Sequence, residues 1–111
     1  MKRTFVESSL FARRVNEEGT EVLKEIQTEV LKNPEGGRVI QGTGGLRKLR
    51  VGDAGRGKGK RGGFRVIYLD LLHIERTHLL VLYDKDEKED ISKDEKKALK
   101  ALVEQIKREA R

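Results

Sequence analysis

The feature that most constrains this chain is one glycine-rich, basic stretch from Arg38 to Arg65. Eleven of the chain's twelve glycines lie between Gly36 and Gly63. The basic stretch carries nine Lys or Arg residues and one acid, Asp53, so its net charge is +8, while the whole chain carries +6 and the remainder therefore −2. Concentrated cations on a backbone with little side-chain bulk favour a polyanion close to main-chain N–H groups, with nucleic acid as the first candidate.

The composition indicates one small folded domain. A chain of 111 residues predicts a single domain spanning residues 1–111. Only 35% of the residues are hydrophobic, but these residues are clustered, which favours folding over disorder. The absence of cysteine excludes disulfides and thiolate metal sites. No signal-peptide pattern and no run of about 20 apolar residues is present, so we expect a cytoplasmic protein without a membrane span.

The first third of the chain predicts a strand followed by a helical hairpin. Thr4 to Glu7 favours a short strand, and Ser8 or Ser9 can cap a helix after it. Thr20 can cap a second helix, which Asn33-Pro34 ends because the residue before proline is disfavoured in the α region.

The remainder predicts three strands and a closing helix. Leu46 to Val51 alternates apolar and basic residues, which places Lys48 and Arg50 on one face of a strand. Phe64 to Leu72 and Thr77 to Tyr83 then form an antiparallel hairpin, while residues 35–45 and 52–63 are predicted as loops. Residues 92–95 have the sequence of a capping box for the last helix. The order of elements predicts an α+β domain with helices packed on an antiparallel sheet.

Two phosphate-binding patterns in the basic stretch are rejected. Gly52 to Gly59 resembles a P-loop, but Gly59 stands where a Ser or Thr must ligate magnesium, and no helix follows. Gly57 to Gly62 matches G-x-G-x-x-G without opening a helix, which is a chance match in a glycine-rich sequence.

The cations themselves support two interpretations. Lys58, Lys60 and Arg61 form either a solvated basic loop that contacts RNA or a phosphate clamp in a catalytic cleft. If Lys48, Arg50 and Arg65 project from one face of the sheet, they form a cationic floor that can hold a scissile phosphate and stabilise its transition state.

The proton-transfer residues are less clearly indicated. His73 and His78 lie in the predicted turn and in an apolar strand, and both are interpreted as structural. Neighbouring cations lower the pKa of a lysine, so Lys60 is a candidate base or acid. Tyr83 can donate a proton or stack on a base, although an ordinary half-buried strand tyrosine is the competing interpretation.

Three segments resemble a known family. VIQGTGGLRKLRV, GKGKRGGFRVIY and LYDKDE resemble the HigB-like branch of the RelE/ParE superfamily, the toxins of type II toxin–antitoxin modules. The resemblance implies a RelE-like fold, with an N-terminal helical hairpin on a twisted antiparallel sheet of about four strands and a C-terminal helix. It also implies a ribosome-dependent mRNA endoribonuclease (an mRNA interferase) that cleaves by attack of the RNA's own 2′-hydroxyl, without metal or cofactor.

The resemblance assigns residues to this activity. The predicted catalytic residues are Arg65, Lys60, Arg61, Lys48, Arg50 and Tyr83, and Lys58 and Lys85 are predicted to bind RNA. Arg47 and Arg56, which belong to the same basic stretch, are also predicted to bind RNA. Two positions depart from the RelE pattern: Asp86 stands where an arginine is expected after the last strand, and Ile91 or its neighbours stand where a catalytic tyrosine is expected.

The resemblance also implies partners. These are a cognate antitoxin with a helix-turn-helix DNA-binding domain, the ribosome with its mRNA, and operator DNA reached only through the antitoxin. Two other functions stay open from the sequence. One is a non-enzymatic RNA- or ribosome-binding module, and the other is a decayed toxin that acts as a regulatory partner, motivated by Asp86 and Ile91.

Overall fold

The computed structural model describes residues 2–52, 63–88 and 90–110. The elements are β1 (Thr4–Glu7), α1 (Ser9–Glu18), α2 (Thr20–Lys32), β2 (Arg38–Val39), β3 (Arg47–Val51), β4 (Phe64–Leu71), β5 (Arg76–Asp84) and α3 (Lys93–Glu109), with a short 3₁₀ turn at Leu72–Ile74. Among these described residues, no helix is long and apolar enough to cross a membrane.

The strands form a single mixed sheet in the order β1-β5-β4-β3-β2. The pairs β2–β3, β3–β4 and β4–β5 are antiparallel, whereas β1 pairs parallel with β5. The predicted α+β class and RelE-like arrangement are confirmed, but the sheet has five strands and one parallel pair rather than about four antiparallel strands. The fifth strand is β2, which lies in a segment predicted as a loop. The parallel pair arises because β1 and β5 become neighbours through a long connection, which local sequence patterns do not reveal.

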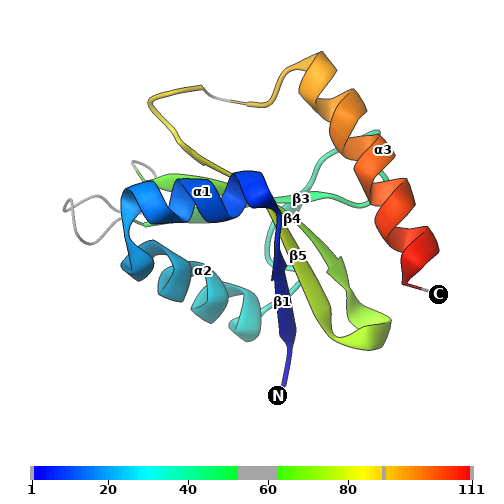
Figure 1. Cartoon of the computed structure of the whole chain (residues 1–111), viewed down its shortest axis with the longest axis horizontal. Coiled ribbons are helices and arrows are strands. Elements are labelled where there is room, and N and C mark those ends of the chain that lie inside the picture. Colours follow the sequence, from blue (N-terminus) through cyan, green and yellow to red (C-terminus); the bar gives the residue numbers. More distant parts are fainter. Residues whose placement is uncertain (1, 53–62, 89, 111) are drawn as a thin grey trace.

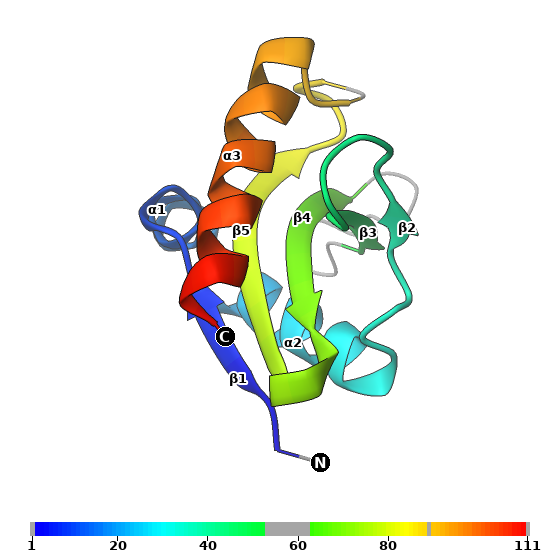
Figure 2. The ribbon, with the colours of Figure 1, turned by 90° about the vertical axis from the view of Figure 1, so that its right-hand side faces the viewer.

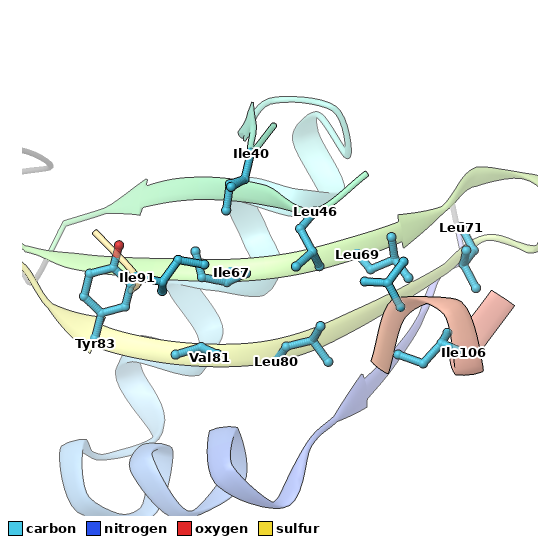
Figure 3. Packing of buried hydrophobic residues seen from close by; sticks show 11 residues of the cluster. Ile40, Leu46, Ile67, Leu69, Leu71, Leu80, Val81, Tyr83, Ile91 and Ile106 are labelled. Atoms are coloured by element: carbon cyan, nitrogen blue, oxygen red, sulfur yellow. The ribbon is translucent and has the colours of Figure 1, made fainter. Parts of the chain in front are cut away.

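The sheet lies between two helical layers (Figure 1). Helices α1 and α2 cover one face, where Phe11, Ile26 and Val66 belong to one buried cluster. Helix α3 covers the other face, and Figure 3 shows the second cluster there, with Ile67, Leu69 and Ile106 among its members. Both faces of the central strands are therefore buried over much of their length, and the described core is split into two layers.

Helix boundaries mostly follow the predicted caps. The Ser8 hydroxyl accepts a hydrogen bond from the Phe11 N–H at 3.0 Å and begins α1. Ser92 and Glu95 form the predicted capping box of α3, with reciprocal bonds of 3.1 and 2.9 Å. The prediction that Thr20 caps α2 is wrong, because Gly19 occupies the N-cap position with φ +100° and no side-chain bond. That left-handed φ favours glycine where the chain reverses between the two helices.

Strand β1 is fixed to the sheet by a buried ion pair. Arg3 Nη1 lies 2.5 Å from Asp70 Oδ1, and the two side chains are 1% and 5% exposed. Thr77 Oγ1 donates to the same carboxylate oxygen at 2.8 Å, so three strand regions meet at one acid. A shift of β1 along β5 would separate Arg3 from Asp70 and leave both charges buried without a partner. The ion pair therefore favours the observed register.

The two tyrosines of the chain provide a matched test of buried hydroxyls. The Tyr68 hydroxyl donates to the Pro34 carbonyl at 2.9 Å and accepts from the Gly37 N–H at 3.0 Å. The Tyr83 hydroxyl is buried without a hydrogen-bond partner among the described residues. We therefore expect Tyr68→Phe to lower the free energy of unfolding by about 1–3 kcal/mol, because the Gly37 N–H loses its acceptor, and Tyr83→Phe to leave it nearly unchanged or slightly higher.

Urea denaturation of the two variants beside the wild type measures this difference. Both substitutions remove one oxygen from a fully buried ring, so each serves as the control for the other. Equal losses of stability in the two variants would contradict the hydrogen bonding described for Tyr68.

Candidate functional site

The candidate site is a row of side chains across the centre of the sheet. Arg50 on β3 lies directly opposite Arg65 on β4, and Arg65 lies directly opposite Tyr83 on β5. Residues directly opposite one another share a face, as do residues two apart on one strand, so Lys48 lies on this face too. The pairing confirms that Lys48, Arg50 and Arg65 project from one face, which is the face that α3 covers farther along the sheet.

Arg65 is the central and most buried cation of this row. Arg65 is 6% exposed, and its Nη1 donates to the Phe64 carbonyl at 3.2 Å. Burial lowers the pKa of Arg65 from its usual value, and the charge of Arg50 lowers it further, whereas Tyr83 and Asp84 act in the opposite direction. Arginine stays charged even so. Two like charges directly opposite on neighbouring strands destabilise the sheet, and an anion bound between them would relieve that repulsion.

A hollow of about 300 Å³ extends this cationic face towards the edge of the sheet. Gly36, Arg38, Lys48, Leu49 and Arg50 line it. Arg38 on β2 is paired directly with Lys48 and so belongs to the same face. Arg38 is not among the predicted site residues, because β2 is two residues long within a segment predicted as a loop. Its only sequence signal was its membership of the basic stretch.

An acidic residue approaches this cationic face from the chain that follows β5. Asp90 Oδ1 lies 3.8 Å from Lys48 Nζ, with the two side chains 52% and 21% exposed. A contact of this length at the surface contributes little to stability. An incoming phosphate can therefore replace Asp90 beside Lys48 at small energetic cost.

Tyr83 shares the row but is enclosed. It is 2% exposed, and Figure 3 shows it in the cluster that also contains Ile91. Lys88 Nζ lies 5.1 Å from the centre of its ring. Burial, followed by the charges of Asp90 and Glu95, raises the pKa of Tyr83 to about 12, although the charge of Arg65 opposes the shift. The ring has no exposed face on which a base can stack, and the hydroxyl is protonated at neutral pH.

Arg47 lies apart from the other predicted RNA-binding residues. Strand alternation places it on the face opposite Lys48, in register with Tyr68. Its Nη1 donates to the carbonyls of Glu35 and Gly37 at 3.0 and 2.8 Å. Arg47 thus fastens the segment before β2, and the structure does not bring it together with Lys48 and Arg50.

The remaining predicted residues fall into two groups. Lys85 is exposed just after β5, where its backbone N–H donates to the Gly63 carbonyl at 3.2 Å. Arg56, Lys58, Lys60 and Arg61 lie outside the described residues. Of the two departures from the RelE pattern, Asp86 donates its N–H to Asp84 Oδ1 at 2.9 Å, and Ile91 is buried.

Comparison with known proteins decides the family. The family model described as "RelE toxin of RelE / RelB toxin-antitoxin system" matches residues 8–110, which is most of the chain. The chain belongs to the RelE toxin family. Membership implies the toxin side of a toxin–antitoxin pair and hence an antitoxin partner.

Two solved structures share the RelE fold. A mutant of the E. coli toxin RelE in the free state matches with a TM-score of 0.56 and 17% identity, covering 80% of this chain and 90% of that one. The isolated E. coli RelE toxin matches with a TM-score of 0.56 and 16% identity, covering 91% and 99%. At these identities the likeness establishes the fold of this RelE-family chain and leaves its site to be argued from its own residues.

The burial of both tyrosines predicts an unusual alkaline titration. Burial raises the pKa of Tyr68 as well as that of Tyr83, and these are the only two tyrosines in a chain without tryptophan. Because the folded pKa values exceed the unfolded value near 10, tyrosine burial stabilises the fold below pH 10, and this stabilisation is lost as the pH rises towards 12.

Absorbance near 295 nm measures this titration directly. We expect little tyrosinate in the native chain at pH 10, and a midpoint of about 12 for Tyr83 in the Tyr68→Phe variant. The urea-unfolded chain, with a midpoint near 10, is the control. A native midpoint near 10 for the Tyr83 hydroxyl would show that it is open to solvent.

Proposed function

We propose that this RelE-family toxin is a ribosome-dependent endoribonuclease that cleaves mRNA in the manner of the HigB-like branch. The observation that carries the proposal is the direct pairing of Arg50 with Arg65 on the face shared by Lys48 and Arg38. Four cations from three adjacent strands lie on this face. Their arrangement suits a single RNA phosphate and its neighbours.

The proposed reaction uses only groups on the RNA and the chain. The 2′-oxygen of one nucleotide attacks the adjacent phosphorus, and the bond from phosphorus to the 5′-oxygen of the next nucleotide breaks. A base removes the 2′-hydroxyl proton, and an acid protonates the departing 5′-oxygen. The products are a 2′,3′-cyclic phosphate and a 5′-hydroxyl end.

Arg65 and Arg50 stabilise the extra negative charge on the phosphorane in this scheme. The planar guanidinium of Arg65 is held by its burial and by the Phe64 carbonyl, so little reorganisation is needed when charge develops. Lys48 holds the neighbouring phosphate once Asp90 is displaced. We propose that Arg38 and Lys85 bind further phosphates of the RNA, and we assign the same role to Arg56 and Lys58.

Lys60 is our candidate for proton transfer, with Arg61 beside it in sequence. Tyr83 is proposed as a positioning residue, because a buried phenol with a pKa of about 12 is a poor base at neutral pH. It lies directly opposite Arg65 on the neighbouring strand, from where it can restrict the orientation of that guanidinium.

A second candidate function rests on the residue at position 91, which is buried in one cluster with Tyr83. Ile91 is buried in the cluster that contains Tyr83, close to where the RelE pattern expects a catalytic tyrosine. This substitution favours a decayed toxin that binds RNA or its antitoxin without cleavage. In either case we propose an antitoxin with a helix-turn-helix domain, through which the pair reaches operator DNA.

Induced expression with mapping of mRNA 5′ ends tests the cleavage proposal. We expect the wild type to arrest growth and to create new mRNA ends within minutes, only while translation continues. Arg50→Ala removes an exposed cation and should slow cleavage about 10²- to 10³-fold, the loss typical of one group that stabilises transition-state charge. Arg65→Lys keeps the charge but removes the bidentate contact with two phosphate oxygens, so we expect a similar defect.

Lys24→Ala is the matched control, because Lys24 is exposed on α2 behind the opposite face of the sheet. It should cleave like the wild type. Full activity in Arg50→Ala and Arg65→Lys would place the site elsewhere. Soluble wild-type protein that creates no new ends would favour the non-cleaving alternative.

A further inference from the structure

A second basic surface lies on helix α3, outside the row of Arg50 and Arg65. Four lysines follow the spacing i, i+3, i+4 and i+7 and therefore lie along one side of the helix. Together with Gly42 and Asp94, they line a hollow of about 460 Å³; they are Lys93, Lys96, Lys97 and Lys100. Lys93, Lys97 and Lys100 are exposed, and Lys96 is half-buried.

These lysines do not stabilise the helix that carries them. Cations in the first turns of a helix oppose its dipole, and like charges three or four residues apart repel each other. In the part of the chain that the structure describes, none of the four takes part in an ion pair. Asp94 is the sole carboxylate among the residues that line the hollow. The surface therefore carries positive charge that a polyanion would neutralise.

The opposite wall of the hollow is a firmly held loop between β2 and β3, and Figure 2 shows α3 passing beside it. Lys107 Nζ donates to the Gly44 carbonyl at 2.6 Å, and buried Thr43 donates to the Ile40 carbonyl at 2.6 Å. Gly42 has a φ of +76° and open space where a Cβ would lie. One wall thus presents flexible cations, and the other presents bare backbone that a bulky ligand can approach.

The position of the hollow connects it to the candidate site. Arg38, which lines the first hollow, lies shortly before the loop that carries Gly42. Asp90, which contacts Lys48, lies two residues before the Ser92 cap of α3. Both hollows lie on the α3 side of the sheet, the first through Arg38, Lys48 and Arg50 and the second through α3 itself.

We propose that the α3 lysine surface binds the phosphate backbone of RNA and anchors the toxin while the Arg50–Arg65 row holds the strand to be cut. This inference rests on the proposed function, because it takes RNA as the ligand, and it adds a second, non-catalytic contact surface. Single-stranded mRNA and structured ribosomal RNA offer the same phosphate chemistry, so the test includes both forms.

The test measures Kd by fluorescence anisotropy over a salt series, with a labelled single-stranded RNA and a labelled RNA hairpin as probes. Lys97→Gln/Lys100→Gln removes two positive charges from α3, and Lys24→Gln/Lys32→Gln removes two from α2 as the charge-matched control. Glutamine has a helix propensity close to that of lysine, so both helices should persist. Thermal unfolding checks this, and we expect no loss of stability in the α3 pair.

We expect the α3 pair to reduce the slope of log Kd against log salt by about 1.4–1.8, since each phosphate contact contributes about 0.7–0.9. The control pair should leave the slope at the wild-type value. A reduced slope with the hairpin alone would assign the surface to structured RNA, and a reduced slope with the single strand alone would assign it to mRNA; either result supports the proposal.

Three outcomes separate this inference from the proposed function. An unchanged slope in the α3 pair, with cleavage still lost in Arg50→Ala, would overturn the inference and leave the ribonuclease standing. A reduced slope with no cleavage by any form of the protein would support the RNA surface and reject the ribonuclease. Weaker binding of a poly-glutamate peptide by the α3 pair, with RNA binding intact, would assign the surface to an acidic protein and overturn the inference.

Discussion

The register of β4 between β3 and β5 is the constraint on which both the core and the candidate site depend. Every residue of β4 is buried except Asp70, which is half-buried. Phe64, Val66 and Tyr68 pack beneath α1 and α2, while Arg65 and Ile67 face the α3 side. A slip of one residue would move Arg65 into the apolar layer beneath α1 and α2 and the ring of Phe64 onto the cationic face. Packing of the core therefore fixes the cation row, and the repulsion between Arg50 and Arg65 is sustained by that packing.

Local patterns in the sequence were sufficient to predict much of this arrangement. The alternation in Leu46 to Val51 placed Lys48 and Arg50 on one face because side chains alternate along any strand. The capping box at Ser92 fixed the start of α3, since both of its hydrogen bonds lie within four residues. The β4–β5 hairpin was predictable for the same reason, because its two strands are adjacent in the chain.

Features that depend on distant contacts were not predictable. The parallel pairing of β1 with β5 joins segments about seventy residues apart, and Arg3 contacts Asp70 only because the sheet brings them together. The enclosure of Tyr83 by Ile91 likewise needs the chain after β5 to fold back. Arg47 is a different case. Strand alternation alone separates it from Lys48, yet its positive charge placed it among the RNA-binding candidates.

The central claim is that RNA binds on the face shared by Arg50 and Arg65. NMR titration of the ¹⁵N-labelled protein with a short RNA, made uncleavable by 2′-O-methyl groups on its riboses, tests it most directly. We predict the largest shifts in the arginine side-chain N–H signals of Arg50 and Arg65 and in the backbone amides of β3 and β4. Shifts centred on α1 and α2, with both arginine signals unmoved, would contradict the account.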